Sequence, residues 1–222
     1  MLFLSVCLLF LGYLISDHNP FLFCLSEIYY LVVVLRRSYV SFVIEMKNAV
    51  TFKIRPLRWN DFEDYCKIER LLQDELNKNP RATMGRYKQQ VNWDYLITSF
   101  SELYKSIKLK RAKTLVLEIN GKVVGLSSII ATESPHAQHI GDLVYYILRQ
   151  YRGKGMGTKL VGEILKNIPR RYEIISAGTH KNNKASEALL KKFGFKKASL
   201  LPRFSKRGKT YLDVEEFYKI IK

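Results

Sequence analysis

After the first 45 residues, the apolar positions of the chain follow two different periods. Residues 51–57 alternate between apolar and polar side chains, as a half-buried strand does. Between 93 and 107 the apolar residues recur every three or four positions, which is the period of an amphipathic helix. A rougher stripe of the same period covers 60–77, where Asn60 fits an N-cap. The pattern predicts one strand and then two helices, joined by a polar and basic loop at 81–92.

The rest of this region predicts two hairpins and two strand–helix units. Strands at 113–119 and 122–131 meet at Asn120-Gly121, which is a strong signal for a two-residue hairpin turn. The later predicted elements are a strand at 143–148, a helix at 158–168, a strand at 173–177, a helix from Asn183 to Gly194, and a hairpin made of 196–204 and 210–218. This order predicts an α/β fold with a single mixed, mostly antiparallel central sheet flanked by helices.

Residues 1–45 form an apolar extension that differs from the rest. Two runs of about 15 residues are short of the roughly 20 that span a bilayer as a helix, and a signal peptide fits poorly. The extension is compatible with a membrane anchor or hairpin, with a helix added to the core or to a partner, and with translation that begins at Met46. We favour the last, and expect the domain boundary between 45 and 46.

The charge of the chain is strongly positive. The net charge is +17 at pH 7; residues 1–45 contribute −1, so residues 46–222 carry +18. Such a charge attracts a polyanionic cofactor, an acidic substrate or a nucleic acid. The basic residues form no compact tract, and a solvated surface accounts for them equally well.

The cysteines and histidines predict no metal site. Cys7, Cys24 and Cys66 lack metal-ligand spacing, and their odd number argues against a disulfide scaffold. The four histidines form no zinc signature. We expect a cytoplasmic protein without a bound metal.

A glycine-rich, basic turn at 151–158 stands between a predicted strand and a predicted helix. This arrangement binds anions, because the first helical N–H groups have no intrahelical partner and lie at the positive end of the helix dipole. A P-loop requires Gly-Lys-Ser/Thr where this chain has Gly-Thr-Lys, and the glycine spacing does not fit a dinucleotide fingerprint. The spacing present is Arg-x-x-Gly-x-Gly, at Arg152, Gly155 and Gly157.

That loop resembles the coenzyme A pyrophosphate loop of the GNAT superfamily of N-acetyltransferases. Residues 183–195 are similar to a second motif of the superfamily, Asn-x-x-Ala-x-x-Leu-Tyr-x-x-x-Gly-Phe, and the predicted element order over 47–222 is similar to its acyl-CoA N-acyltransferase fold. The resemblance implies an enzyme that transfers an acetyl group from acetyl-CoA to a primary amine of a small molecule or a protein, by direct attack of the amine.

The resemblance also implies where acetyl-CoA would bind. The pyrophosphate would rest on backbone N–H groups of 152–158, and the pantetheine arm would pair with the preceding strand. A backbone N–H near Ile147 or Leu148 would stabilise the oxyanion, an interaction worth about 3–4 kcal/mol in a preorganised site. The implied coenzyme-binding residues are Ile147, Leu148, Arg149, Arg152, Gly153, Lys154, Gly155, Met156, Gly157, Thr158, Asn183 and Ser186.

The catalytic residues do not follow directly from the motif, because the chain departs from it. Leu190 stands where the superfamily has a proton-donating tyrosine, and leucine cannot donate a proton. Tyr145, Tyr146 and Tyr211 are candidate replacements, and Asp142, Glu118 and His139 are candidate bases. One residue of register would move any of them to the other face of the sheet. Asp142, Glu118 and Tyr145 are the catalytic candidates that we carry forward.

The acceptor is expected between residues 60–105 and the last hairpin. Arg81, Arg86, Tyr87 and Lys88 would favour an acceptor with a carboxylate or phosphate, although a solvated loop explains them as well. Two other functions stay open: a non-catalytic coenzyme-binding or interaction module, because of Leu190, and a nucleic-acid- or ribosome-associated acetyltransferase, because of the charge. A homodimer, and a membrane contact through residues 1–45, also stay open.

Overall fold

The computed structural model describes residues 33–36, 52–79, 91–132 and 134–221. The chain divides into two units, Met1–Val50 and Thr51–Lys222, and a short helical stretch at 33–36 is the described part of the first. The expectations for residues 1–45 therefore rest almost wholly on residues outside the described part, as do those for Arg81, Arg86, Tyr87 and Lys88. Within the described ranges, no helix combines the length and the apolar character needed to cross a bilayer.

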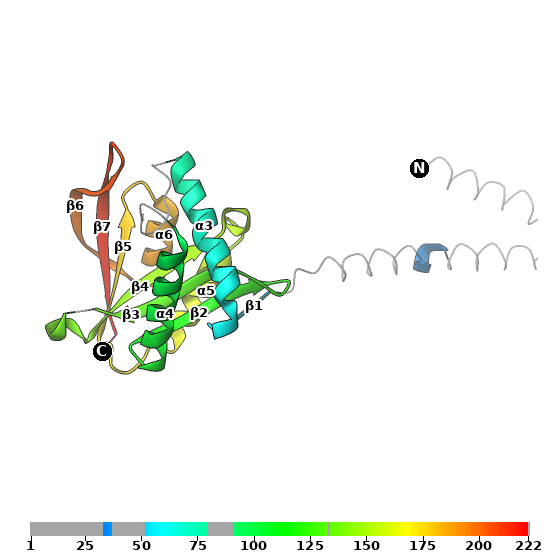
Figure 1. Ribbon diagram of the computed structural model, residues 1–222, viewed down its shortest axis with the longest axis horizontal. Coiled ribbons are helices and arrows are strands. Elements are labelled where there is room, and N and C mark those ends of the chain that lie inside the picture. Colours follow the sequence, from blue (N-terminus) through cyan, green and yellow to red (C-terminus); the bar gives the residue numbers. More distant parts are fainter. Residues whose placement is uncertain (1–32, 37–51, 80–90, 133, 222) are drawn as a thin grey trace, which may run out of the picture. The chain divides into compact units, whose positions relative to one another are not determined.

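The described part of the second unit is built on one sheet of seven strands, in the order β1-β2-β3-β4-β5-β7-β6 (Figure 1). The strands are β1 (Phe52–Pro56), β2 (Ala112–Ile119), β3 (Lys122–Ala131), β4 (Ile140–Ile147), β5 (Ile174–His180), β6 (Lys196–Arg207) and β7 (Thr210–Ile220). Every neighbouring pair is antiparallel except β4 with β5. The predicted mixed, mostly antiparallel α/β fold is confirmed.

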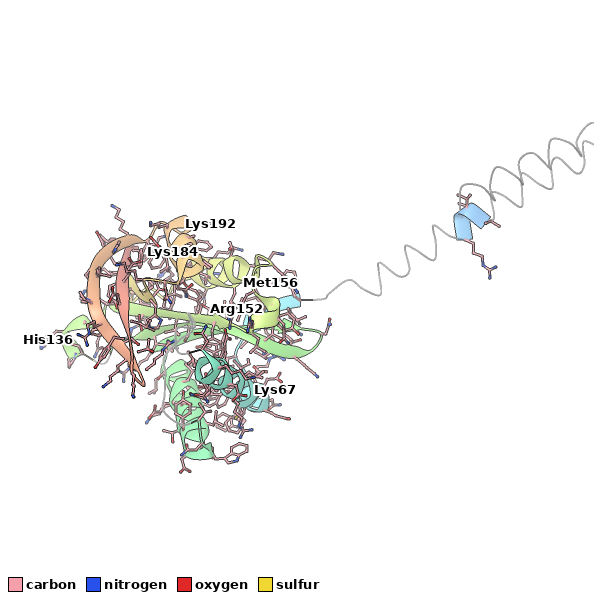
Figure 2. The ribbon with its side chains drawn as sticks, turned by 90° about the horizontal axis from the view of Figure 1, so that it is seen from above. Lys67, His136, Arg152, Met156, Lys184 and Lys192 are labelled. Atoms are coloured by element: carbon pink, nitrogen blue, oxygen red, sulfur yellow. The ribbon has the colours of Figure 1, made fainter. Side chains whose placement is uncertain are left out.

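Helices cover both faces of this sheet. They are α3 (Phe62–Lys78), α4 (Trp93–Lys108), α5 (Met156–Lys166) and α6 (Lys184–Lys192). Figure 2 shows α3, marked by Lys67, on one side of the sheet, and α6, marked by Lys184 and Lys192, on the other. The apolar stripe of α5 supplies Leu160, Val161 and Ile164, which are fully buried, and burial of such a side chain contributes about 1.5–3 kcal/mol.

Local signals predicted the hairpin turn, but not every helix end: the helix predicted at 158–168 runs from Met156 to Lys166. Asn120 and Gly121 both have positive φ, 51° and 78°, as a type I′ hairpin turn requires. The predicted N-cap Asn60 is wrong, because Asn60 lies in a 3-10 turn and α3 begins after Asp61. The Asp61 carboxylate accepts the N–H of Arg58 at 2.7 Å and two bonds from Arg55 of β1, so a tertiary ion pair fixes where the helix begins.

The two parallel strands, β4 and β5, separate part-way along the sheet. They pair through 140–142 and 174–176, after which β4 stays with β3 and β5 stays with β7. Side chains along β4 alternate between the two faces. Tyr146 reaches Glu69 of α3, whereas Tyr145 reaches Ser186 of α6. Asp142 and Val144 share the face of Tyr146, which we call the α3–α4 face; the opposite one is the α5–α6 face.

Candidate functional site

A cavity of about 810 Å³ opens where β4 and β5 separate. Its walls come from β4, the glycine loop, the start of α5, β5, α6, β6 and β7, and its volume suits a cofactor-sized ligand. The predicted coenzyme-binding residues that line it are Ile147, Arg152, Gly153, Gly155, Gly157, Thr158, Asn183 and Ser186. Leu148, Arg149, Lys154 and Met156 belong to the same loop but lie outside the lining. The fold thus brings together both stretches that were singled out in the sequence.

Two glycines give the loop its shape. Gly153 and Gly155 both have φ of +73°, a left-handed conformation that side chains other than glycine rarely adopt. Gly155 is the residue before α5, and its carbonyl accepts the N–H of Lys159 at 3.1 Å. The N–H groups of 156–158 therefore form the first turn of α5 at the rim of the cavity. A helix start of this kind binds an anion such as a phosphate.

The three guanidinium nitrogens of Arg152 all donate hydrogen bonds to other groups of the protein. Its two terminal nitrogens donate to the two carboxylate oxygens of Glu75 on α3, each at 2.7 Å, and its Nε donates to the carbonyl of Ile147 at 2.7 Å. These bonds from Arg152 lower the pKa of Glu75, despite partial burial. Glu75 therefore balances the Arg152 charge, which leaves less of that charge to attract a phosphate at the loop. Arg152 instead ties the loop to α3.

One backbone edge of β4 faces the opening between β4 and β5. The N–H of Leu148 donates to the carbonyl of Val124 in the direction of β3, at 2.9 Å. Hydrogen bonding alternates along an antiparallel pair, so the N–H groups of Tyr145 and Ile147 point the other way, toward the separated β5. Of the two expected oxyanion donors, Leu148 is therefore excluded and Ile147 remains.

The tyrosine candidates occupy different places. Leu190 is fully buried in the core, so its position in the motif serves packing. Tyr145 lines the cavity, and its hydroxyl is hydrogen-bonded to the hydroxyl of Ser186. Burial raises the pKa of Tyr145, which keeps the phenol protonated at neutral pH. Tyr146 turns its hydroxyl to the α3–α4 face, and Tyr211 lies outside the cavity lining. Tyr145 is the phenol that the structure places at the cavity.

Two carboxylates meet at the cavity, and the sequence indicated one of them. Asp142 accepts a long bond from the Ser176 hydroxyl at 3.4 Å. Glu216 of β7 lies over Gly178 of β5, where a Cβ would stand 2.9 Å from its carboxylate oxygen. The register places both carboxylates on the α3–α4 face. Burial, followed by the charge of Asp142, raises the pKa of Glu216. A carboxylate with a raised pKa is a better acceptor for the proton of an ammonium group.

The other predicted bases are not part of this site. The Glu118 carboxylate binds Lys53 at 3.0 Å and Arg55 at 2.6 Å, and the hydrogen bonds from Lys53 and then Arg55 lower its pKa. It lies where β1 pairs with β2, outside the lining of the cavity. His139 is exposed and also outside the lining. Glu118 is thus corrected from a catalytic candidate to part of a structural ion-pair cluster.

The profile of the Acetyltransferase (GNAT) family matches residues 68–195, which is more than half of the chain. The chain belongs to this family. No curated protein sequence matched the chain.

Solved structures share the fold of this GNAT domain. Ribosomal-protein-alanine N-acetyltransferase from Brucella melitensis is 23% identical, with a TM-score of 0.66 over 76% of this chain and 99% of that one. An N-acetyltransferase from Staphylococcus aureus Mu50 is 24% identical, with a TM-score of 0.64 over 78% and 99%. The protein yncA from Salmonella typhimurium, solved with its cofactor acetyl-CoA, is 20% identical, with a TM-score of 0.65 over 77% and 94%. At these identities the likeness shows the fold.

The GNAT domain has a second cavity, of about 530 Å³, on the α3–α4 face. It is enclosed by α3, α4, β3 and β4, and it shares Val144 and Tyr146 with the first cavity. The two cavities therefore meet at β4, beside the place where β4 leaves β5. Within the described ranges, no group of three or more His, Cys, Asp or Glu side chains is arranged to hold a metal ion.

Proposed function

We propose that the protein is an acetyl-CoA-dependent N-acetyltransferase, with acetyl-CoA in the cavity between β4, β5 and α6. The observation that carries this proposal is the glycine loop, which turns the first N–H groups of α5 toward a cavity of cofactor size. Family membership supports it, as do two neighbours, yncA and RimL, whose structures contain acetyl-CoA and coenzyme A.

The proposed donor geometry uses the backbone more than side chains. The pyrophosphate accepts hydrogen bonds from N–H groups of 153–158, and the pantetheine arm lies along the open edge of β4. The thioester carbonyl accepts the N–H of Ile147, which stabilises the negative charge that develops on the oxygen. Asn183 and Ser186 bound the arm from α6, where the Asn183 side chain also caps the helix by accepting the Ser186 N–H at 3.1 Å.

The proposed reaction is a direct transfer. The neutral amine nitrogen attacks the thioester carbon, a C–N bond forms, and the C–S bond then breaks. The proton released by the amine passes to the pair of Asp142 and Glu216. The leaving thiolate takes a proton from Tyr145, which recovers one from solvent. The products are the acetyl amide and the free thiol of coenzyme A.

The acceptor in this proposal is a primary amine of a small molecule or a protein. The names of the neighbours include both kinds, since one acts on ribosomal-protein alanine and another is described as a phosphinothricin N-acetyltransferase. The charge of +18 on residues 46–222 favours a ribosome-associated substrate as the second candidate. Binding to RNA that weakens steeply with salt would support that candidate, and binding without salt dependence would eliminate it.

Calorimetric titration of the full-length protein with acetyl-CoA tests the donor site. We expect wild-type binding that the Gly155→Glu variant loses, because the new side chain strains a backbone at φ +73° and places a negative charge at the helix start. The control is Gly121→Glu, the same change at a glycine with φ +78° that lies outside the cavity lining.

Each outcome has a distinct meaning. If Gly155→Glu abolishes binding and Gly121→Glu retains it, the coenzyme is placed on the loop. No binding by wild-type protein at millimolar acetyl-CoA would defeat the proposal. Binding without turnover of any amine would favour the non-catalytic module.

A further inference from the structure

The strand β6 carries a bulge beside the first cavity. Leu201 of β6 pairs with Val214 of β7, and the next pair is Ser205 with Leu212. Three residues of β6, 202–204, therefore stand opposite one residue of β7. A bulge of this kind bends the strand and redirects its side chains, and bulges are common beside active sites.

Contacts within the β6–β7 hairpin hold this bulge in place. Arg203 has a φ of +54°, in the left-handed region that residues other than glycine seldom adopt. The Asp213 carboxylate accepts the Arg203 N–H at 2.9 Å, and the Arg203 guanidinium carbon lies 4.2 Å from the centre of the Tyr211 ring. A residue in such a conformation persists only where its surroundings stabilise it, and such residues gather at ligand-binding sites.

The bulge leaves an aromatic ring exposed at the cavity. Phe204 follows Arg203 and lines the first cavity together with Ser205. Its exposed fraction is 68%, the largest among the large apolar side chains of the described residues. An exposed aromatic ring in the wall of a cavity can bury the apolar surface of a ligand.

The wall that carries Phe204 lies away from the proposed coenzyme site. The lining residues of β7 are Val214 and Glu216, which share the α3–α4 face. The helices α5 and α6, whose first residues bound the proposed coenzyme site, lie on the opposite face. Ser205 pairs with Leu212, which is on the same face as Val214, so the wall beside Phe204 continues the side on which the Glu216 carboxylate lies. We therefore assign Phe204 to the acceptor and not to the coenzyme.

The wall between Glu216 and the bulge suits an uncharged part of the acceptor. It consists of Gly178, His180 and Val214, and His180 pairs with Val214. Burial, followed by the charge of Arg207, lowers the pKa of His180 to about 4, so the imidazole is neutral at neutral pH. Arg207 itself is fully buried and lies outside the cavity lining.

The register of the strands sets the length of the acceptor. Strand residues two apart are separated by roughly 7 Å. Val214 is one such step along β7 from Glu216, and Leu212, which pairs with Ser205, is a second step. An acceptor whose amine lies beside Glu216 therefore reaches the Phe204 ring over one to two steps, or about 7–14 Å.

We propose that Phe204, presented by the bulge at 202–204, binds an aromatic ring of the acceptor, so that the acceptor class is an arylalkylamine with several bonds between its nitrogen and its ring. This rests on the proposed acetyltransferase function. The acceptor ring packs against Phe204 while the amine lies at the pair of Asp142 and Glu216. Aromatic pairs that are offset-stacked or edge-to-face attract each other beyond the area that they bury.

Three amines test the requirement for a ring and its distance from the nitrogen. They are butylamine, which has no ring, phenethylamine, whose ring is two carbons from the nitrogen, and 4-phenylbutylamine, whose ring is four carbons away. Coenzyme release is measured with saturating acetyl-CoA on the full-length protein. We expect kcat/KM for 4-phenylbutylamine to exceed that for butylamine by about tenfold or more, with phenethylamine between them.

Variants at the ring assign the preference to Phe204. Phe204→Ala should bring kcat/KM for 4-phenylbutylamine down to that for butylamine and leave acetyl-CoA binding unchanged, whereas Phe204→Tyr should keep the preference. The control is Leu200→Ala, which truncates an exposed apolar side chain of the same strand outside the cavity lining and should also keep it.

Variants at the bulge test how the ring is held. Asp213→Ala removes the group that accepts the Arg203 N–H and should lower the preference for 4-phenylbutylamine. Arg203→Gly should keep the preference, because glycine adopts a φ of +54° without strain and the guanidinium takes no part in binding the ring. Acetyl-CoA binding that matches the wild type shows that each variant is folded.

The outcomes separate the two proposals. Equal kcat/KM for 4-phenylbutylamine and butylamine in the wild type, or a preference that survives Phe204→Ala, would overturn the assignment of Phe204. Weaker acetyl-CoA binding in Phe204→Ala with normal binding in Leu200→Ala would also overturn it, because the ring would then belong to the coenzyme site. Binding of acetyl-CoA without acetylation of any probe would overturn the arylalkylamine class and leave the donor site standing. Failure of acetyl-CoA to bind would instead remove the function on which this proposal rests.

Discussion

The ion pair between Arg152 and Glu75 distinguishes two roles for the arginine of the glycine loop. In one role Arg152 fastens the loop to α3; in the other it contacts the coenzyme pyrophosphate directly. Two substitutions separate them: Arg152→Met, which keeps the apolar stem, and Glu75→Gln, which leaves the arginine in place. Lys154→Met is the control, because it removes an exposed positive charge from the same loop.

The geometry sets the size of the effect. The pair makes two bonds of 2.7 Å, and its side chains are 30% exposed for Arg152 and 18% for Glu75. Exposed pairs contribute about 0–1 kcal/mol, and breaking a buried pair costs about 3–5 kcal/mol. For this intermediate case we expect each variant to lose about 2 kcal/mol, which corresponds to a fall in Tm of about 4–8 °C for a domain of this size.

The pH dependence has a definite sign. The pKa of Glu75 is lowered in the folded protein, so its stabilisation is present above the unfolded pKa of about 4.3 and is lost as pH falls through the folded value. The Tm difference between wild type and Glu75→Gln should therefore shrink in acid.

Thermal unfolding and acetyl-CoA titration are measured on the same four proteins. If Arg152 holds the loop against α3, Arg152→Met and Glu75→Gln both lower the Tm of the free protein and weaken acetyl-CoA binding by similar factors. Lys154→Met then keeps the wild-type Tm. The reasoning is refuted if Arg152→Met weakens binding without lowering Tm while Glu75→Gln binds as well as wild type. That pattern would indicate that Arg152 contacts the coenzyme pyrophosphate directly.

Three further outcomes follow from the site. Tyr145→Phe should lower kcat by about 100-fold with unchanged acetyl-CoA affinity, and a kcat within threefold of wild type would exclude it as the proton donor. Asp142→Asn should move the acidic limb of the kcat/KM–pH profile to lower pH, because it removes a negative charge that raises the pKa of Glu216; an unmoved limb would show that Glu216 is not the base. Leu190→Tyr should cost about 1–3 kcal/mol in urea unfolding without raising kcat, because the side chain is fully buried, and a rate increase would contradict its role in packing.

The sequence predicted those features that depend on neighbouring residues. The Asn120-Gly121 turn has the two positive φ angles that its residue types favour, and α4 follows the stripe seen at 93–107. The loop at Gly155 was recognisable because the strand, glycine turn and helix are consecutive. The N-cap prediction failed at Asn60 because the competing group, Arg55, comes from another element.

Candidate bases could not be ranked from the sequence. Glu118 and Asp142 look alike as strand carboxylates, yet Glu118 is bound by Lys53 and Arg55, whereas Asp142 lines the cavity. No local sequence signal indicated Glu216, because its place at the cavity depends on its position over Gly178 of another strand.

The order of the elements, the glycine loop and the family motifs can be read from the sequence, because local backbone preferences and short spacings set them. What each side chain faces depends on the tertiary fold. Arg152 meets a glutamate 77 residues away, and Tyr145 and Tyr146 point to opposite faces of one strand. The physical reason is that side chains alternate along a strand, so pairing register and helix placement fix which charges gather at a cavity.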